Sequence, residues 1–479
     1  MRYAGNTRFA LLKRKKFFTM AHSATTEKRA SWTSKWAFVL AAAATAVGLG
    51  NMWRFPYLAA KYGGGTFLLT YLVLVATFGL SLLLLESALG RYTRKSDIGA
   101  YSHFGKKFMW IGIIASVVPF IITPYYCIIG GWVTKYTVSY LTAGPAALAD
   151  GGTFFSSFMT SNVESYVWMG IFMALVFCVV GFGVEKGIER VNSILMPALI
   201  VMALGIAIFA LTLPGALEGA AYYLIPDFSK FSPELVINAL GQMFYSLSLA
   251  MGITVTYGSY MRKQDSLTTS VAQIAGFDFG VSFLAGLAIV PAAFVAMGSA
   301  DAVAAKSGPS LMFITLPQVF NTLDPTVATI VGFVFFLLVL FAALTSAIGL
   351  TEACVSIVQD GMHWPRRQAF VVCIAVIAVV GMFVNAGYNV LSGIEPLGPG
   401  SSLLDFFDFV SNSVIMPIVE ILTCLMFGWF VKENVLAREI KESSAFKLEK
   451  AWTIMIKFVA PVLIALILIW NIIPYLGLA

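Results

Sequence analysis

The chain has 479 residues, of which 59% are hydrophobic and only 11% are Asp, Glu, Lys or Arg, and its net charge is +7. An average soluble domain has about 25% charged residues, so this composition excludes an ordinary water-soluble protein. The length alone would suggest about three soluble domains, but the hydrophobicity indicates one bundle of membrane-spanning helices. Because the basic residues gather at one set of predicted span ends, the positive charge does not indicate nucleic-acid binding.

The first 30 residues carry a basic run at 13–16 with no apolar segment after it. We therefore predict no cleaved signal peptide and interpret residues 1–30 as a cytoplasmic tail. Beyond the tail, eleven apolar stretches are each long enough to cross a bilayer as a helix, which takes about 20 residues. They are approximately 36–60, 66–90, 109–141, 166–183, 190–213, 235–260, 270–299, 326–357, 369–388, 403–430 and 452–476.

Connections that contain Lys and Arg alternate along the chain with connections that are nearly free of them. Arg91 and Lys106 lie between spans 2 and 3, Lys186 between spans 4 and 5, and Arg366 between spans 8 and 9, whereas 142–165 has no Lys or Arg. By the positive-inside rule the N-terminus is cytoplasmic, and eleven spans place the C-terminus outside. We expect a multi-pass protein of the plasma (inner) membrane, surrounded by the lipid bilayer.

Span 1 contains Ala-Val-Gly-Leu-Gly-Asn at 46–51. Each glycine weakens a helix interior by about 1 kcal/mol relative to alanine. Unpaired backbone in lipid is tolerated only where it lines an enclosed or wet cavity. There, freed N–H groups favour an anion and freed carbonyls favour a cation.

Span 6 has a comparable weak point, where two serines and a glycine lie within 245–252. Spans 1 and 6 begin two predicted five-span halves, and paired interrupted spans in corresponding positions indicate a transporter site. The alternative is that glycine and serine only allow helices to pack closely.

Further motifs accompany the span 1 segment 46–56, and they are found at 61–65, at Glu86 with 90–92, at Tyr125 and Tyr126, at Gly241 and Gln242, and at 344–346. With these motifs the chain resembles the neurotransmitter:sodium symporter family over about residues 28–478; its bacterial members include the leucine transporter LeuT. The resemblance implies an all-α polytopic protein with a LeuT-like 5+5 inverted repeat and discontinuous spans 1 and 6. The repeats would cover 31–215 and 216–434, with the eleventh span and C-terminus at 435–479, in a monomer or weak oligomer.

The resemblance implies two Na⁺ sites at the bilayer midplane, both built from the hard oxygen ligands that a hard cation prefers. The first would use Ala46, Asn51, Ser246 and Asp278. The second would use Ala44, Val47, Ala342, Thr345 and Ser346. For the two hydroxyls of this second set, the alternative is a hydrogen bond to a carbonyl one turn earlier.

The resemblance also implies that the substrate is a small-molecule amino acid. Its carboxylate would meet the Leu49 and Gly50 amides and the Tyr126 hydroxyl. Gly48 stands where monoamine carriers of the family have an aspartate for the amine, which favours a substrate with its own carboxylate. The pocket wall would also include Ile122, Tyr245, Ser246, Ser248, Ala250, Met251, Ala347 and Leu350. These residues are mostly apolar, so a neutral, hydrophobic amino acid fits best.

Asp278 departs from the asparagine seen in many members. The polar cage of chloride-dependent relatives is matched by Tyr71, Gln242, Ser246 and Ser282. Asp278 can itself supply the negative charge beside sodium, so we predict transport without chloride.

The resemblance implies an outer gate of Arg54, Gln242 and Asp408, with Tyr245 as a lid, and an inner gate of Arg29, Trp32 and Asp360. Arg54 could instead be an interface arginine that extends to the headgroups. In span 5, Gly187 and Pro197 have the family spacing that lets the inner end unwind; the alternative is an ordinary kink. The apolar loop 300–325 either packs on the bundle or forms an outer lid.

Five scattered cysteines and three histidines outside the apolar runs give no metal spacing and no catalytic histidine at depth. We therefore predict that the protein is not an enzyme. The preferred hypothesis is a sodium-coupled symporter that imports the amino acid by alternating access. The main alternative is a sodium-dependent amino-acid sensor that binds without turnover.

Overall fold

The computed structural model describes residues 30–298, 310–431 and 434–476. Residues Ser31–Ala479 form one compact unit, distinct from Met1–Ala30. The described part of this unit is helical, and its one extended feature is an isolated bridge between Gly64 and Pro226.

Nine helical runs in the described residues are long and apolar enough to cross a membrane, and a bent pair of helices makes a tenth candidate. The nine runs contain α4 (Gly65–Leu74) with α5 (Leu80–Thr93), α7 (Met109–Thr142), α9 (Glu164–Gly181), α10 (Arg190–Leu211), α14 (Leu267–Met297), α17 (Pro325–Met362), α18 (Arg366–Ala386), α19 (Leu403–Asp408) with α20 (Met416–Leu425), and α22 (Glu449–Ile454) with α23 (Ala460–Ile472). This confirms an all-helical, multi-pass membrane protein. The exact count of eleven spans and the inverted repeat stay predictions.

Span 1 is interrupted where its glycines predict a break. It consists of α2 (Lys35–Ala46), a π-helical turn (Gly50–Arg54) and α3 (Phe55–Lys61), and its two halves are bent by 55°. Span 6 consists of α12 (Pro233–Ser246) and α13 (Ile253–Ser259), with residues 247–252 non-helical between them. The side chains of Ser34 and Ser232 cap the starts of α2 and α12, so sequence fixes these helix ends locally.

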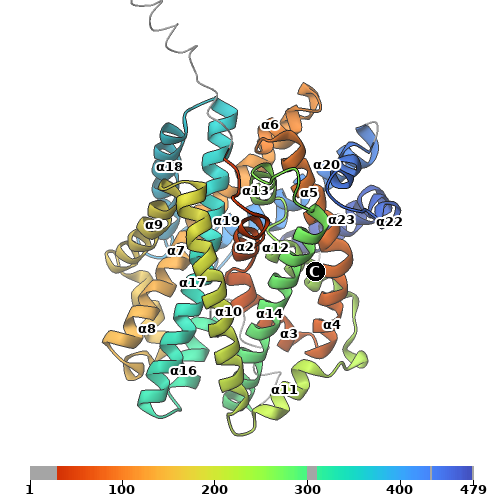
Figure 1. The fold of residues 1–479 in the computed structure, drawn as a ribbon. Helices are drawn as coiled ribbons and strands as arrows, with labels where there is room; N and C mark the ends of the chain where they lie inside the picture. Colours follow the sequence, from red (N-terminus) through yellow and green to blue (C-terminus); the bar gives the residue numbers. More distant parts are fainter. Residues whose placement is uncertain (1–29, 299–309, 432–433, 477–479) are drawn as a thin grey trace, which may run out of the picture. The chain divides into compact units, whose positions relative to one another are not determined.

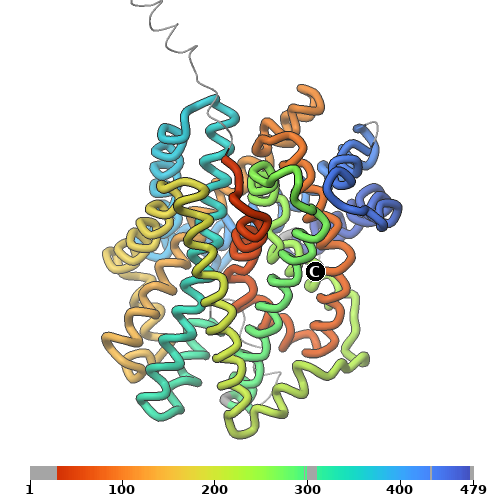
Figure 2. The backbone as a smooth tube through the Cα atoms, viewed as in Figure 1, coloured from red at the N-terminus to blue at the C-terminus, as the bar shows by residue number. Residues whose placement is uncertain are grey.

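Helix α2, the first half of the interrupted span 1, lies inside the bundle, in contact with α10, α14 and α17 (Figure 1). Alanines at 41, 43 and 44 have no exposed surface, and such small side chains let helix backbones approach closely in a membrane. The tube in Figure 2 shows the chain passing several times between the two ends of this helical unit. The 38-residue helix α17, which contacts α2, also packs along α7.

Short helices form the connections: α6 (Asp97–Ser102), α8 (Gly151–Thr160), α11 (Ala216–Leu224), α16 (Leu316–Phe320) and α21 (Val435–Lys441). The described part of the apolar connector before α17 is packed on the bundle. Its Phe313 is fully buried against Trp132 and Tyr136, and its ring centroid lies 6.4 Å from that of Trp53.

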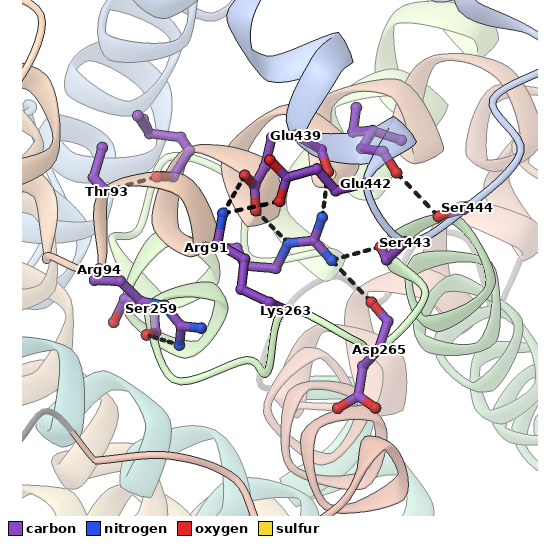
Figure 3. Close-up of polar contacts among 12 residues, drawn as sticks. Arg91, Thr93, Arg94, Ser259, Lys263, Asp265, Glu439, Glu442, Ser443 and Ser444 are labelled. Atoms are coloured by element: carbon purple, nitrogen blue, oxygen red, sulfur yellow. Dashed lines mark hydrogen bonds and ion pairs between the residues drawn. The ribbon is translucent and has the colours of Figure 1, made fainter.

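A buried ion pair fastens the end of α5 to α21 (Figure 3). Arg91 Nε lies 2.7 Å from Glu439 Oε1, and neither side chain is exposed. The same guanidinium also donates to the Asp265 carbonyl at 2.8 Å and to Ser443 Oγ at 2.7 Å. Lys263 approaches the other Glu439 oxygen at 2.7 Å from a half-exposed position. One arginine therefore joins three separate chain segments.

Replacing Arg91 by methionine should destabilise the protein strongly, because it leaves the buried Glu439 carboxylate with only one cationic partner. Breaking a buried pair costs about 3 kcal/mol or more. We expect a clearly lower thermal unfolding midpoint for Arg91→Met in detergent. The control is Arg190→Met, an exposed arginine, which should match the wild type. An unchanged midpoint for Arg91→Met would show that the pair is not a stabilising contact.

Candidate functional site

Side chains from three helices satisfy the interrupted backbone of span 1. The Gly48 N–H donates to Asn51 Oδ1 at 2.9 Å, and the Leu49 N–H donates to the Tyr126 hydroxyl at 3.1 Å. On the opposite side, the Ser346 hydroxyl donates to the Thr45 carbonyl at 2.9 Å. Polar groups that lipid could not satisfy are thus paired within the protein, and they face a shared space.

Three of the four predicted ligands of the first sodium site form one buried network, and the fourth, Ala46, lines the adjacent pocket. Asn51 Nδ2 lies 2.7 Å from Asp278 Oδ1, 2.9 Å from Ser246 Oγ and 2.7 Å from Ser282 Oγ. Ser246 also donates to Asp278 Oδ1 at 2.7 Å, and the Tyr71 hydroxyl lies 3.4 Å from the other carboxylate oxygen. Asn51 and Asp278 have no exposed surface. The Asp278 carboxylate and the hydroxyls of Ser246 and Ser282 are hard oxygen ligands that suit a monovalent cation, whereas the Asn51 oxygen accepts from the Gly48 N–H in this structure.

At the predicted second sodium site, the hydroxyls of Thr345 and Ser346 donate hydrogen bonds to nearby backbone carbonyls, including those of Ala342 and Val47. Thr345 Oγ1 donates to the carbonyls of Phe341 at 2.9 Å and Ala342 at 3.1 Å, which is the one-turn bond weighed as an alternative. The Ser346 hydroxyl lies 3.3 Å from the Val47 carbonyl. Residues of α2 and α17 therefore converge at one point. Ala44, the remaining predicted ligand, is fully buried in α2.

A narrow pocket lies between the interrupted spans and α7 and α17. Most residues predicted for the substrate line it, namely Gly48, Leu49, Gly50, Ile122, Tyr126, Tyr245, Ser246, Ser248, Met251 and Leu350. Ala250 and Ala347 are buried but do not line it. Thr45 and Ile253 also line it, and they were not predicted because each lies one residue outside the segments 46–51 and 245–252.

The break in span 6 is held open by a carboxyl group from α5. Ser248 and Ala250 have φ of 55° and 58°, in the left-handed region that L-residues seldom adopt, and Gly252 has φ of 71°. The buried Glu86 accepts a hydrogen bond from the Ala250 N–H at 2.7 Å. Glu86 belongs to one of the motifs noted in the sequence, but no sequence pattern indicates which backbone group it binds.

Above the pocket lies a larger cavity, with about 1060 Å³ of space, that contains the predicted outer gate. Arg54 and Asp408 both line it, and no ion pair within 4.0 Å joins these two described residues. Asp408 instead accepts from Tyr125 at 3.1 Å and from Asn412 at 2.6 Å. Tyr245 lines both the pocket and the larger cavity.

Gln242, the third predicted member of the outer gate, binds span 1. Its Nε2 donates to the Gly50 carbonyl at 3.2 Å. In span 5, Gly187 lies in a π-helical turn (Val184–Glu189) and Pro197 lies inside α10, and the run Val184–Leu211 is helical throughout. The inner end of span 5 is therefore wound in this structure.

The opposite end of the pocket is closed at the predicted inner gate. Trp32 is 1% exposed, packs edge-on against Tyr257 and Tyr260, and donates its indole N–H to the Tyr257 carbonyl at 3.0 Å. Asp360 accepts from the Ser96 N–H at 2.7 Å and from its hydroxyl at 2.8 Å. Arg29 lies outside the described residues. The described residues thus close the end at Trp32 and Asp360 and leave a cavity at the end with Arg54 and Asp408.

Comparisons with known proteins agree with this arrangement. The family model described as the sodium:neurotransmitter symporter family matches residues 29–148 and 159–478. The uncharacterized sodium-dependent transporter YhdH of Bacillus subtilis is 34% identical over 449 residues, which cover 92% of this chain and 97% of YhdH. The sodium- and chloride-dependent taurine transporter of Canis lupus familiaris is 26% identical, over 94% of this chain and 79% of that protein.

A solved structure is similar as well. The crystal structure of MhsT in complex with L-phenylalanine superimposes with a TM-score of 0.81 at 34% identity, covering 92% of this chain and 99% of MhsT. The matched family consists of transporters, which confirms the prediction that this protein is a transporter rather than an enzyme. The chain therefore belongs to the sodium:neurotransmitter symporter family.

Proposed function

We propose that the protein imports a neutral, hydrophobic amino acid together with sodium ions by alternating access. The observation that carries the proposal is the pocket between two interrupted spans, where the Leu49 amide and the Tyr126 hydroxyl lie beside the Asn51–Asp278 network. A substrate carboxylate placed there would meet a half-helix N-terminus and complete the first sodium site. Substrate and ion would then each strengthen the binding of the other.

The character of the pocket supports the substrate class. None of its lining residues is Asp, Glu, Lys or Arg, and Ile122, Met251, Ile253 and Leu350 supply an apolar end. A charged side chain would be stranded there without a partner, whereas an aliphatic or aromatic side chain would be buried favourably. MhsT, the structural neighbour, was solved in complex with L-phenylalanine, which has both a carboxylate and an uncharged apolar side chain.

Two sodium ions would bind at the predicted sites, and the N-terminus would face the cytoplasm. The second ion would replace the hydrogen bonds that Thr345 and Ser346 now make to carbonyls. Arg54 and Asp408 would close the outer cavity once substrate is bound. Trp32 would leave its site between Tyr257 and Tyr260 when the inner side opens.

The test is uptake into proteoliposomes. Labelled phenylalanine should accumulate above its equilibrium level when sodium is outside and potassium inside, and not when sodium is equal on both sides. Competition by the twenty amino acids should rank neutral apolar ones first and charged ones last. Sodium-dependent binding without accumulation would instead identify a sensor.

Chloride should not be required, because the Asp278 carboxylate supplies negative charge beside the first ion. Two unit charges 4 Å apart interact by about 4 kcal/mol at an effective dielectric constant of 20. Replacing chloride by gluconate should leave wild-type uptake within about twofold. Asp278→Asn should raise the sodium concentration for half-maximal uptake at least tenfold, and the remaining uptake should respond to chloride. Asp150→Asn, which alters an exposed aspartate, should behave as wild type. Wild-type uptake that collapses in gluconate would refute this role of Asp278.

Gly50→Ala should weaken substrate binding at least tenfold. A Cβ at Gly50 would lie 2.8 Å from the Tyr245 ring, so the ring must move away from the pocket mouth. The measurement is the KM of uptake or the Kd of labelled phenylalanine. Gly205→Ala is the matched control, because a Cβ there has no neighbour within 4 Å. Equal KM values for the two variants would show that Tyr245 does not cover the substrate.

A further inference from the structure

Two carboxyl groups lie side by side beneath the break in span 6. Glu86 of α5 and Glu420 of α20 interact directly, and they are 1% and 0% exposed. One Glu86 oxygen binds the Ala250 N–H. The other Glu86 oxygen and both oxygens of Glu420 meet no hydrogen-bond donor in the described part of the chain. A proton held on one of the two carboxyls supplies the donor that this arrangement lacks.

A third carboxyl, Asp97, lies against the same break from the connection between spans 2 and 3. It is 1% exposed, and its Oδ2 has no hydrogen-bond partner among the described residues. A Cβ at Gly252 would lie 2.4 Å from that oxygen, so the glycine allows the carboxyl to touch the span 6 backbone. Met251, the neighbour of Gly252, lines the substrate pocket. Asp97 thus lies against the residue that follows a pocket-lining side chain.

The groups around Asp97 oppose its ionisation. Glu86 faces it from α5 and Asp360 from α17, and Tyr101 lies beside it on α6. The charged side chains nearest in sequence are basic: Arg94 donates to the Ser259 carbonyl at 3.2 Å, and Lys95 is exposed beside Gly99. Burial, with further contributions from Glu86 and Asp360, raises the pKa of Asp97 to about 8.

We propose that Asp97 binds a cytoplasmic proton when the inner side of the transporter closes and releases it when that side opens. The inference rests on the proposed transport function and its orientation. Opening must separate α13 from α6, since Gly252 covers Asp97, and water then reaches the carboxyl. A hydrated aspartic acid has a pKa of about 3.9, so the open form favours the ionised state. The closed form takes up the proton, and the proton returns to the compartment from which it came.

The direction of the pH effect follows from this difference. Because the pKa is higher in the closed form, protonation favours closure at low pH. Between about pH 4 and pH 8, each unit of rise in cytoplasmic pH shifts the equilibrium about tenfold toward the open form. Above pH 8 both forms are ionised and the effect levels off. Cytoplasmic acidification would therefore hold the inner side closed.

The first experiment varies internal pH from 6.0 to 9.0 in proteoliposomes at constant external pH. Sodium-driven uptake by the wild type should rise at least fivefold between pH 6.0 and 8.0 and then level off. Asp97→Asn should stay within twofold across the range, and Asp97→Ser serves if the first variant does not fold. Glu185→Gln, at an exposed glutamate, should follow the wild type. A transporting Asp97→Asn variant with the wild-type profile would overturn the proposal.

The second experiment does not need transport. Hydrogen–deuterium exchange of residues 248–259, corrected for intrinsic exchange, should show at least tenfold more opening at pH 8 than at pH 6 in the wild type. In Asp97→Asn the two values should agree within twofold. Equal pH responses in the two proteins would refute the proton site. If exchange responds as expected but no sodium-driven uptake occurs, the proposed transport function fails while the proton site stands.

Discussion

The structure depends on satisfying peptide groups that leave helical pairing inside a membrane. Lipid offers no hydrogen bonds, so each interruption needs partners from neighbouring helices. Tyr126 and Asn51 supply them at the span 1 break, and Glu86 supplies one at the span 6 break. These partners are buried; Asn51 belongs to span 1 itself, whereas Tyr126 comes from α7 and Glu86 from α5. The breaks are therefore stable only in the assembled bundle, and the bundle is held in register by the groups that the breaks require.

Much of this arrangement could be predicted from sequence because the signals are local. The glycines at 48 and 50 mark the bend in α2–α3, and the serines and Gly252 mark the gap between α12 and α13. Charge alternation and apolar length located the spans to within a few residues. The residues proposed for the first sodium site, among them Asn51, Ser246 and Asp278, could be named only through the family resemblance.

What sequence could not predict depends on how distant segments meet. Asp97 follows a run of charged residues and reads as an exposed loop aspartate, yet folding places it under Gly252. Glu420 lies in an apolar helix with no sequence neighbour to pair with, and only the packing of α20 on α5 brings it beside Glu86. Thr45 and Ile253 face the pocket because of the helix bend, whose angle no motif encodes.

Tyr245 lies between the pocket and the larger cavity. A single ring forms the wall shared by the inner pocket and the outer cavity, and its edge rests on Gly50. Rotation of that one side chain would join the two spaces into a continuous aqueous passage ending at the Asn51–Asp278 network. In the proposed transport function, the bulk of a bound side chain would set how far the ring can swing, so the contact that selects the substrate would also decide how readily water reaches the proposed sodium site.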